Sequence, residues 1–75
     1  MTTQKELNRI KKHFKYLNDI QWIESMGIGF QMKTQTLTAT KITMSEEIGY
    51  KFHNARSYSL DQDYVIATFA RKEPS

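Results

Sequence analysis

The sequence contains no cysteine, a single proline, three glycines and no long hydrophobic run. Without cysteine, the chain forms neither disulfide bonds nor thiolate metal sites. Its apolar stretches are far shorter than the roughly 18 residues that a membrane-spanning helix needs. The N-terminal stretch is polar and charged, unlike a signal peptide. We therefore expect a cytoplasmic protein without a membrane segment, held together by packing.

The chain is also too short to bury much surface. We expect its 75 residues to form one domain, residues 1–75. A domain of this size buries only about 60% of the surface of its unfolded chain, so the core is small. Apolar residues make up 39% and charged residues 25%, values typical of a folded domain. A thin core leaves little stability for a strained active site, which favours a binding role.

No catalytic, metal-binding or cofactor-binding motif is present. His13 and His53 are isolated, without spaced carboxylates that would complete a metal site. Glu46 and Glu47 are adjacent, and neighbouring residues on a helix point about 100° apart, so they do not converge on one atom. The Asp61-Gln62-Asp63 triplet lacks the glycine and the terminal glutamate of a calcium loop. We predict that the protein is not an enzyme and uses no metal or cofactor.

The N-terminal segment carries the clearest structural pattern. Its large apolar residues recur at the spacing of one helical face: Leu7, Ile10, Phe14 and Leu17. Thr3 is a suitable N-cap, and Glu6 three residues later completes a capping box. The pattern predicts an amphipathic helix from here to about Asn18 or Asp19, with its apolar face against the core.

The opposite side of this helix is cationic. Residues 1–20 hold five basic and two acidic side chains, so nearly all of the net charge of +3 lies there. We predict that the partner-binding residues are Lys5, Arg9, Lys12, Lys15 and Tyr16, with Lys11 on the flank. Tyr16 suits an interface because tyrosine is a common anchor there. The alternative interpretations are an ordinary solvated helix face and a surface that binds phosphates.

The remaining sequence predicts an α+β domain with a small antiparallel sheet of about three strands. Alternation of apolar and polar residues favours strands at about 27–33 and 36–44, and a largely apolar strand at 64–70. Ser45-Glu46-Glu47 resembles the start of a short second helix, with Ile48, Phe52 and Ala55 facing inward. Open strand edges invite pairing with a second copy, so we expect a homodimer.

A short cysteine-free chain with the N-terminal segment MTTQKELNRIKKHFKYL and a threonine-rich, aromatic sheet resembles the small early proteins of bacteriophages. Among these it is most similar to staphylococcal-phage inhibitors of the bacterial DNA sliding clamp. The resemblance implies a non-enzymatic protein that blocks the clamp of the host by direct contact. The glutamine–aliphatic–aromatic peptide of many clamp partners is absent, since Gln4–Ile10 and Gln35–Thr38 lack its aromatic pair.

From these observations we expect a protein-binding inhibitor that acts on a host replication protein, with the sliding clamp as the candidate partner. The alternative is a small nucleic-acid-binding protein that uses the same cationic row on phosphates. Salt distinguishes the two, because three to five phosphate contacts give a log–log slope of about −3 to −4.5.

Overall fold

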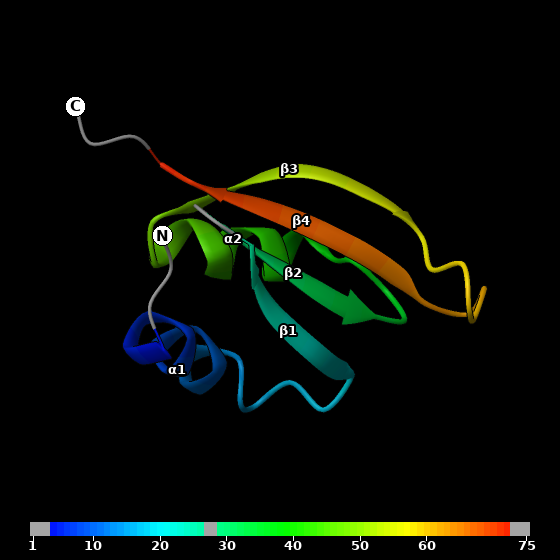
Figure 1. Cartoon of the computed structure of the whole chain (residues 1–75), viewed down its shortest axis with the longest axis horizontal. Coiled ribbons are helices and arrows are strands. Elements are labelled where there is room, and N and C mark those ends of the chain that lie inside the picture. Colours follow the sequence, from blue (N-terminus) through cyan, green and yellow to red (C-terminus); the bar gives the residue numbers. More distant parts are fainter. Residues whose placement is uncertain (1–3, 27–28, 73–75) are drawn as a thin grey trace.

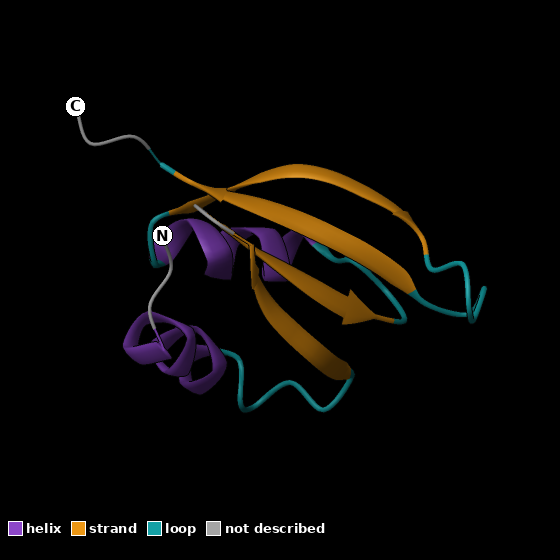
Figure 2. Ribbon diagram, in the orientation of Figure 1, coloured by secondary structure: helices purple, strands orange, loops and turns teal. Residues whose placement is uncertain are grey.

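The computed structural model describes residues 4–26 and 29–72. Two helices and four strands follow one another along the chain (Figure 1): α1 (Gln4–His13), β1 (Ile20–Met26), β2 (Gly29–Thr34), α2 (Ala39–Glu47), β3 (Tyr50–Ser57) and β4 (Val65–Arg71). The strands form one antiparallel sheet in the order β1-β2-β4-β3 (Figure 2). The prediction of an α+β fold with an antiparallel sheet is confirmed, and the sheet has four strands instead of about three.

Alternate residues of the two central strands build the core. Phe30 and Met32 of β2 lie beside Phe69 and Ala67 of β4, and all four side chains are buried. The rings of Phe30 and Phe69 are stacked with their centroids 5.0 Å apart. The ring of Tyr50 meets Phe30 edge-on at 5.0 Å. Aromatic pairs of this kind add stability beyond the area that they bury.

Both helices cover the same face of the sheet. Ile10 of α1 and Phe14 just after it are buried in the core cluster, and Ile42 and Ile48 pack against that cluster from α2 and its C-cap. The prediction that the apolar stripe of the N-terminal helix faces the core is therefore confirmed. No helix among the described residues lies on the other face of the sheet.

The first helix is shorter than expected, and the prediction that it runs to Asn18 or Asp19 is wrong. It ends at His13, and the chain then tightens through hydrogen bonds from Lys15 N–H to the Lys12 carbonyl and from Leu17 N–H to the Phe14 carbonyl. Such 3₁₀-type hydrogen bonds, between residues three positions apart, are common where a helix ends. They keep Phe14 and Leu17 against the core while the backbone turns toward β1. The predicted cap at Thr3 lies outside the described residues.

The segment after the helix is strand β1, which the sequence analysis did not predict. Ile20, Trp22 and Ile23 are β-branched or aromatic and suit a pleated surface. Ile23 is opposite Met32 on the core side of the sheet, whereas Trp22 is opposite Lys33 on the other side. The predicted strand at 27–33 corresponds to β2, and Gly27 and Ile28 lie outside the described residues.

The predicted strand at 36–44 is wrong, because helix α2 occupies most of it. Thr38 is the N-cap, and its hydroxyl oxygen accepts a hydrogen bond from Lys41 N–H at 3.3 Å. Helical spacing then places Lys41 and Ser45, four residues apart, on the buried side. Threonine favours strands, yet here its capping hydroxyl and the tertiary contacts of Lys41 select a helix.

The predicted helix that starts at Ser45 is also wrong. Ser45 is buried inside α2, where its hydroxyl donates to the Lys41 carbonyl at 3.0 Å. The helix ends at Glu47, and Gly49 then adopts a φ of +91°, a conformation that favours glycine. The expected inward helical face of Ile48, Phe52 and Ala55 is not formed, since Phe52 and Ala55 belong to β3.

The prediction of the last strand is confirmed. The expected strand at 64–70 is β4, shifted by one residue.

Strand β3 differs from the other strands in its exposure. In β3 Tyr50 is buried, but every later residue is exposed, and a bulge at His53 interrupts the pairing with β4. β3 therefore forms an open edge of the sheet.

Candidate functional site

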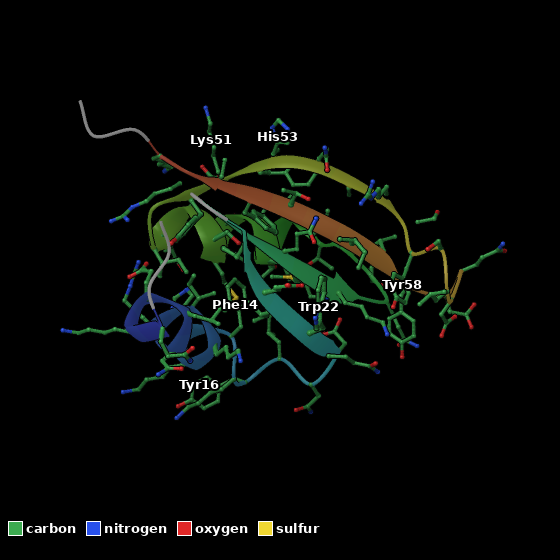
Figure 3. The ribbon with its side chains drawn as sticks, in the orientation of Figure 1. Phe14, Tyr16, Trp22, Lys51, His53 and Tyr58 are labelled. Atoms are coloured by element: carbon green, nitrogen blue, oxygen red, sulfur yellow. The ribbon has the colours of Figure 1, made fainter. Side chains whose placement is uncertain are left out.

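The predicted partner-binding residues lie on the outer side of α1 and in the turn that follows it. Lys5 and Lys12 are exposed on the helix. Lys15 and Tyr16 come directly after it, and 80% of the Tyr16 side chain is exposed. Figure 3 shows the Tyr16 ring pointing away from the sheet. Four of the five predicted residues are thus accessible to a partner.

Arg9 differs from its neighbours because its guanidinium group contacts the protein itself. It pairs with the Glu6 carboxylate through Nε and Nη2, and Nη2 also donates to the backbone carbonyl of Ile48 at 2.9 Å. The hydroxyl of Tyr50 donates to the same carboxylate at 3.0 Å. These bonds join α1 to the end of α2 and the start of β3, so we assign Arg9 a structural role.

The ionisation of this cluster follows from its contacts. The Arg9 guanidinium lowers the pKa of Glu6 by hydrogen bonding, and partial burial opposes this effect. Burial raises the pKa of Tyr50, and its hydrogen bond to Glu6 raises that pKa further. Glu6 also raises the pKa of Arg9. The cluster therefore holds a carboxylate, a guanidinium and a neutral phenol at neutral pH.

Tyr16 and its neighbours form a cationic and aromatic surface. The ammonium group of Lys15 lies 5.0 Å from the centroid of the Tyr16 ring, within the range of a cation–π interaction. A shallow pocket of about 370 Å³ lies beside the ring and is lined by Arg9, Lys12, His13, Tyr16 and Ile48. An exposed ring next to a pocket resembles the aromatic anchors of protein interfaces.

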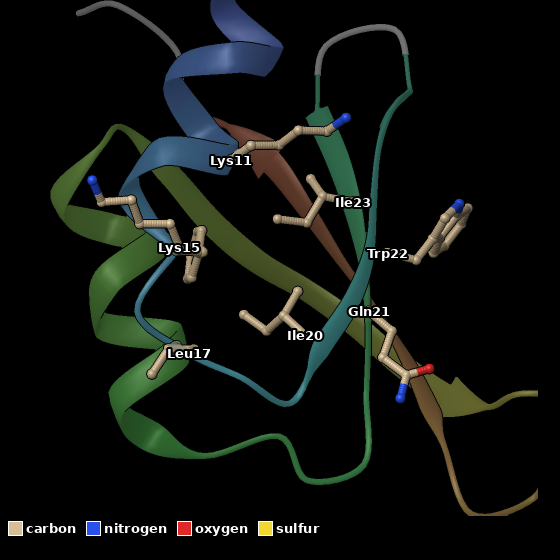
Figure 4. A pocket seen from close by; sticks show the side chains of 8 residues that line it. Lys11, Lys15, Leu17, Ile20, Gln21, Trp22 and Ile23 are labelled. Atoms are coloured by element: carbon tan, nitrogen blue, oxygen red, sulfur yellow. The ribbon is translucent and has the colours of Figure 1, made fainter.

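A second hollow lies between the end of α1 and strand β1, and we call it the α1–β1 groove. Its volume is about 320 Å³, and its lining residues are Lys11, Phe14, Lys15, Leu17, Ile20, Gln21, Trp22 and Ile23. Figure 4 shows Ile20 and Ile23 pointing toward the helix side, with Lys11 and Lys15 extending from the helix. The groove therefore has an aliphatic floor and lysines at its border.

Of the groove residues, Lys15 is one of the five predicted partner-binding residues, and Lys11 was expected on their flank. Ile20 and Ile23 were expected after a long helix, so their position in a strand facing Lys11 and Lys15 was not predicted. The signal was present in the run of Ile20, Trp22 and Ile23, which favours a strand over a helix.

The histidines and the acidic residues outside these two surfaces do not come together as a site among the described residues. His13 Nε2 lies 3.6 Å from a carboxylate oxygen of Glu47, and His53 is exposed at the bulge of β3. Glu46 and Glu47 lie at the C-terminal end of α2 and not at the start of a helix, where the sequence pattern placed them. Asp61 Oδ1 accepts the backbone N–H of Asp63 within a loop.

Residues 4–26 and 29–72 contain no group of three histidine or carboxylate side chains placed to hold a metal ion. Neither α1 nor α2 has the length and apolar character needed to cross a membrane. Comparison with models of protein families, with curated proteins and with solved structures found no match for this chain.

Proposed function

We propose that this protein is a non-enzymatic inhibitor that docks on another protein in the cytoplasm through the α1–β1 groove and the adjoining Tyr16 surface. The observation that carries the proposal is the aliphatic groove bordered by Lys11 and Lys15. Leu17, Ile20 and Ile23 are only partly buried by the protein itself, so a partner could cover them further.

The chemistry of the groove defines the partner surface. An aliphatic floor gains free energy when an apolar side chain covers it. The lysines at its border favour carboxylates beside that apolar group. β1 is also an edge strand of the sheet, with β2 as its neighbour. The occupant that fits is an apolar segment of a partner protein flanked by acidic residues.

The particular partner that we propose is the bacterial DNA sliding clamp, with the protein as a phage-encoded inhibitor of replication. This proposal rests on the resemblance to phage inhibitors stated above. With a net charge of +3, the chain is not an acidic imitation of DNA. In our proposal it instead contacts an acidic and apolar part of the clamp.

The experiment is a direct binding measurement with purified staphylococcal sliding clamp, combined with clamp-dependent DNA synthesis. The test variant is Lys11→Glu/Lys15→Glu, and the matched control is Lys51→Glu/Lys72→Glu, which reverses two exposed charges elsewhere. We expect the first to weaken binding at least about tenfold and to abolish inhibition, since charge reversal at an interface is costly. The control should bind as the unaltered chain does.

Two outcomes contradict different parts of the proposal. Absence of binding to the clamp refutes that partner. Equal binding by the test and control variants refutes the α1–β1 groove as the docking surface. If duplex DNA binds instead, with a steep salt dependence that the Lys11/Lys15 variant reduces, the phosphate-binding alternative replaces this proposal.

The expected homodimer remains a prediction, and β3 is the edge at which a second copy would pair. Its residues after Tyr50 are exposed. However, Lys51, Arg56 and the bulge at His53 are features that discourage edge-to-edge pairing. Light scattering over a range of concentrations tests the prediction, and a constant monomer mass would refute it.

A further inference from the structure

A second surface lies on the sheet face opposite the helices. The strand register places four residues in one row across all four strands: Trp22 of β1, Lys33 of β2, Ile66 of β4 and Arg56 of β3. Trp22 points away from Ile20 and Ile23, as Figure 4 shows. The row therefore lies on the opposite side of the sheet from the aliphatic floor of the α1–β1 groove, and Trp22 lies at the border that the two surfaces share.

Two adjoining pockets open on this row and share Trp22 and Tyr58. One has a volume of about 370 Å³ and is lined by Trp22, Gln31, Arg56, Ser57, Tyr58, Ser59 and Ile66. The other has a volume of about 310 Å³ and is lined by Gln21, Trp22, Lys33 and Tyr58. Only 6% of Ile66 is exposed, although it lies on the outer face, so it forms an apolar floor beneath its neighbours.

Contacts on this face hold the aromatic side chains in place. The ammonium group of Lys33 lies 4.6 Å from the ring centroids of both Tyr58 and Tyr64. The Gln21 amide donates to the Tyr64 hydroxyl at 2.6 Å. A site whose rings are already ordered loses less conformational entropy when a ligand binds. Tyr58 and Tyr64 are thus held in position before a ligand arrives.

The charge of this face is positive. Three cationic side chains lie on it, those of Lys33, Lys51 and Arg56. Among the paired positions of the described strands, Glu24 supplies the single carboxylate on this face. The register partners of Lys51 and Arg56 are Ala70 and Ile66, four residues apart on β4. At about 3.3 Å per residue, the two cations are about 13 Å apart along the sheet. They can contact an anionic chain that runs along β3.

We propose that this outer sheet face binds single-stranded nucleic acid, with one unpaired base between Trp22 and Tyr58 on the floor formed by Ile66. A base has two flat faces that stack on aromatic rings. The Gln31 amide supplies hydrogen-bonding groups at the pocket that suit the edge of a base. Lys51 and Arg56 then contact the phosphates. The site goes beyond the proposed docking function and does not depend on it.

The chain provides its own probe for this site, because Trp22 is its only tryptophan. We would titrate the full chain with ten-nucleotide oligothymidine and oligoadenosine, and with the corresponding duplex, while recording tryptophan emission. We expect saturable quenching by the single strands and much weaker quenching by the duplex. The affinity should fall with salt at a log–log slope of about −1.4, from two phosphate contacts on a single strand.

Variants locate the site. Tyr58→Ala should weaken binding about tenfold or more, since stacking on each base is worth that much, whereas Tyr58→Phe should bind nearly as the unaltered chain does. Arg56→Gln should weaken binding and reduce the salt slope by about 0.7. Tyr16→Ala removes an equally aromatic side chain far from this face and should have no effect. Circular dichroism verifies that each variant is folded.

The proposal is overturned if single strands leave the emission unchanged up to millimolar nucleotide concentrations. It is also overturned if the duplex binds as tightly as the single strands, or if Tyr16→Ala weakens binding as much as Tyr58→Ala does. If Tyr58→Ala instead abolishes binding of the sliding clamp, this face is a protein interface and the nucleobase proposal fails. Failure of the nucleobase proposal is distinct from failure of the proposed docking function. The docking function depends on the α1–β1 groove, and the variant Lys11→Glu/Lys15→Glu tests it separately.

Discussion

The ammonium group of Lys41 on α2 is paired with the carboxylate of Asp19, in the segment between α1 and β1. Only 4% of the Lys41 side chain is exposed. Its Nζ also donates to Thr34 Oγ1 at 2.7 Å and to the Thr36 carbonyl. This buried charge connects the segment before β1, the end of β2 and helix α2, and it is satisfied by three oxygen atoms.

Removal of the charge on Asp19 tests this connection. We expect Asp19→Asn to lower the free energy of unfolding by about 1–3 kcal/mol, because it leaves a buried ammonium group without its counterion. The loss is less than for a fully buried pair, since 39% of the Asp19 side chain is exposed. Urea denaturation measures it, with Asp63→Asn on the exposed loop as the control. Equal stability of the two variants would contradict the role of the pair.

The pH dependence of stability follows from the two carboxylates whose pKa values are lowered in the fold. Hydrogen bonds from Lys41 lower the pKa of Asp19 from its usual 3.8, and those from Arg9 lower the pKa of Glu6 from its usual 4.5. In acid the unfolded chain therefore binds more protons than the folded chain. The stability that these two carboxylates contribute is fully present above about pH 5 and is lost as the pH falls below their usual pKa values. Urea denaturation from pH 7 to pH 3 should show this decline, and Asp19→Asn should make it shallower.

Arg9 and Lys12 lie one helical turn apart and should respond differently to neutralisation. Arg9→Gln removes the ion pair with Glu6 and the bond to the Ile48 carbonyl, so we expect a loss of about 0.5–1.5 kcal/mol. Its side chain is 49% exposed, which limits the effect of the ion pair itself. Lys12→Gln should change stability by less than about 0.5 kcal/mol. Thermal denaturation followed by circular dichroism compares them, and a larger loss for Lys12→Gln would refute the structural role of Arg9.

Gly49 provides a test of the backbone alone. A Cβ built at this position has no neighbour within 4 Å, but the φ of +91° strains any L-residue with a side chain. We expect Gly49→Ala to lower the free energy of unfolding by about 1 kcal/mol or more, and Gly49→Asn to lower it less, because asparagine tolerates positive φ better. Urea denaturation of both variants gives the comparison. No loss in Gly49→Ala would show that the turn between α2 and β3 relaxes freely.

The apolar periodicity of the first helix, the alternation in β2 and the largely apolar run of β4 were sufficient to predict those elements. Ile10 and Phe14 enter the core because helical spacing places them on one side. The sequence did not predict α2, because its buried side carries Lys41 and Ser45 in place of apolar residues. A buried lysine is stable only beside partners such as Asp19, which lies 22 residues earlier in the chain.

The candidate surfaces likewise have features that the sequence predicted and features that it did not. The exposed cations and Tyr16 of the N-terminal segment were predicted, since a charged helix face is encoded by local spacing. The hydrogen bond from Arg9 to the Ile48 carbonyl was not predicted, because those residues are 39 positions apart. The row of Trp22, Ile66 and Arg56 likewise depends on strand order and register.

By itself, the sequence determined the class of fold, the apolar face of the first helix and the concentration of positive charge near the N-terminus, because these follow from composition and short-range periodicity. Only the tertiary structure decided that residues 39–47 form a helix, that residues 20–26 form an edge strand, and which side chains meet on the two faces of the sheet. Pairing between strands and burial of an ion pair join residues far apart in the chain, so local pattern does not specify them.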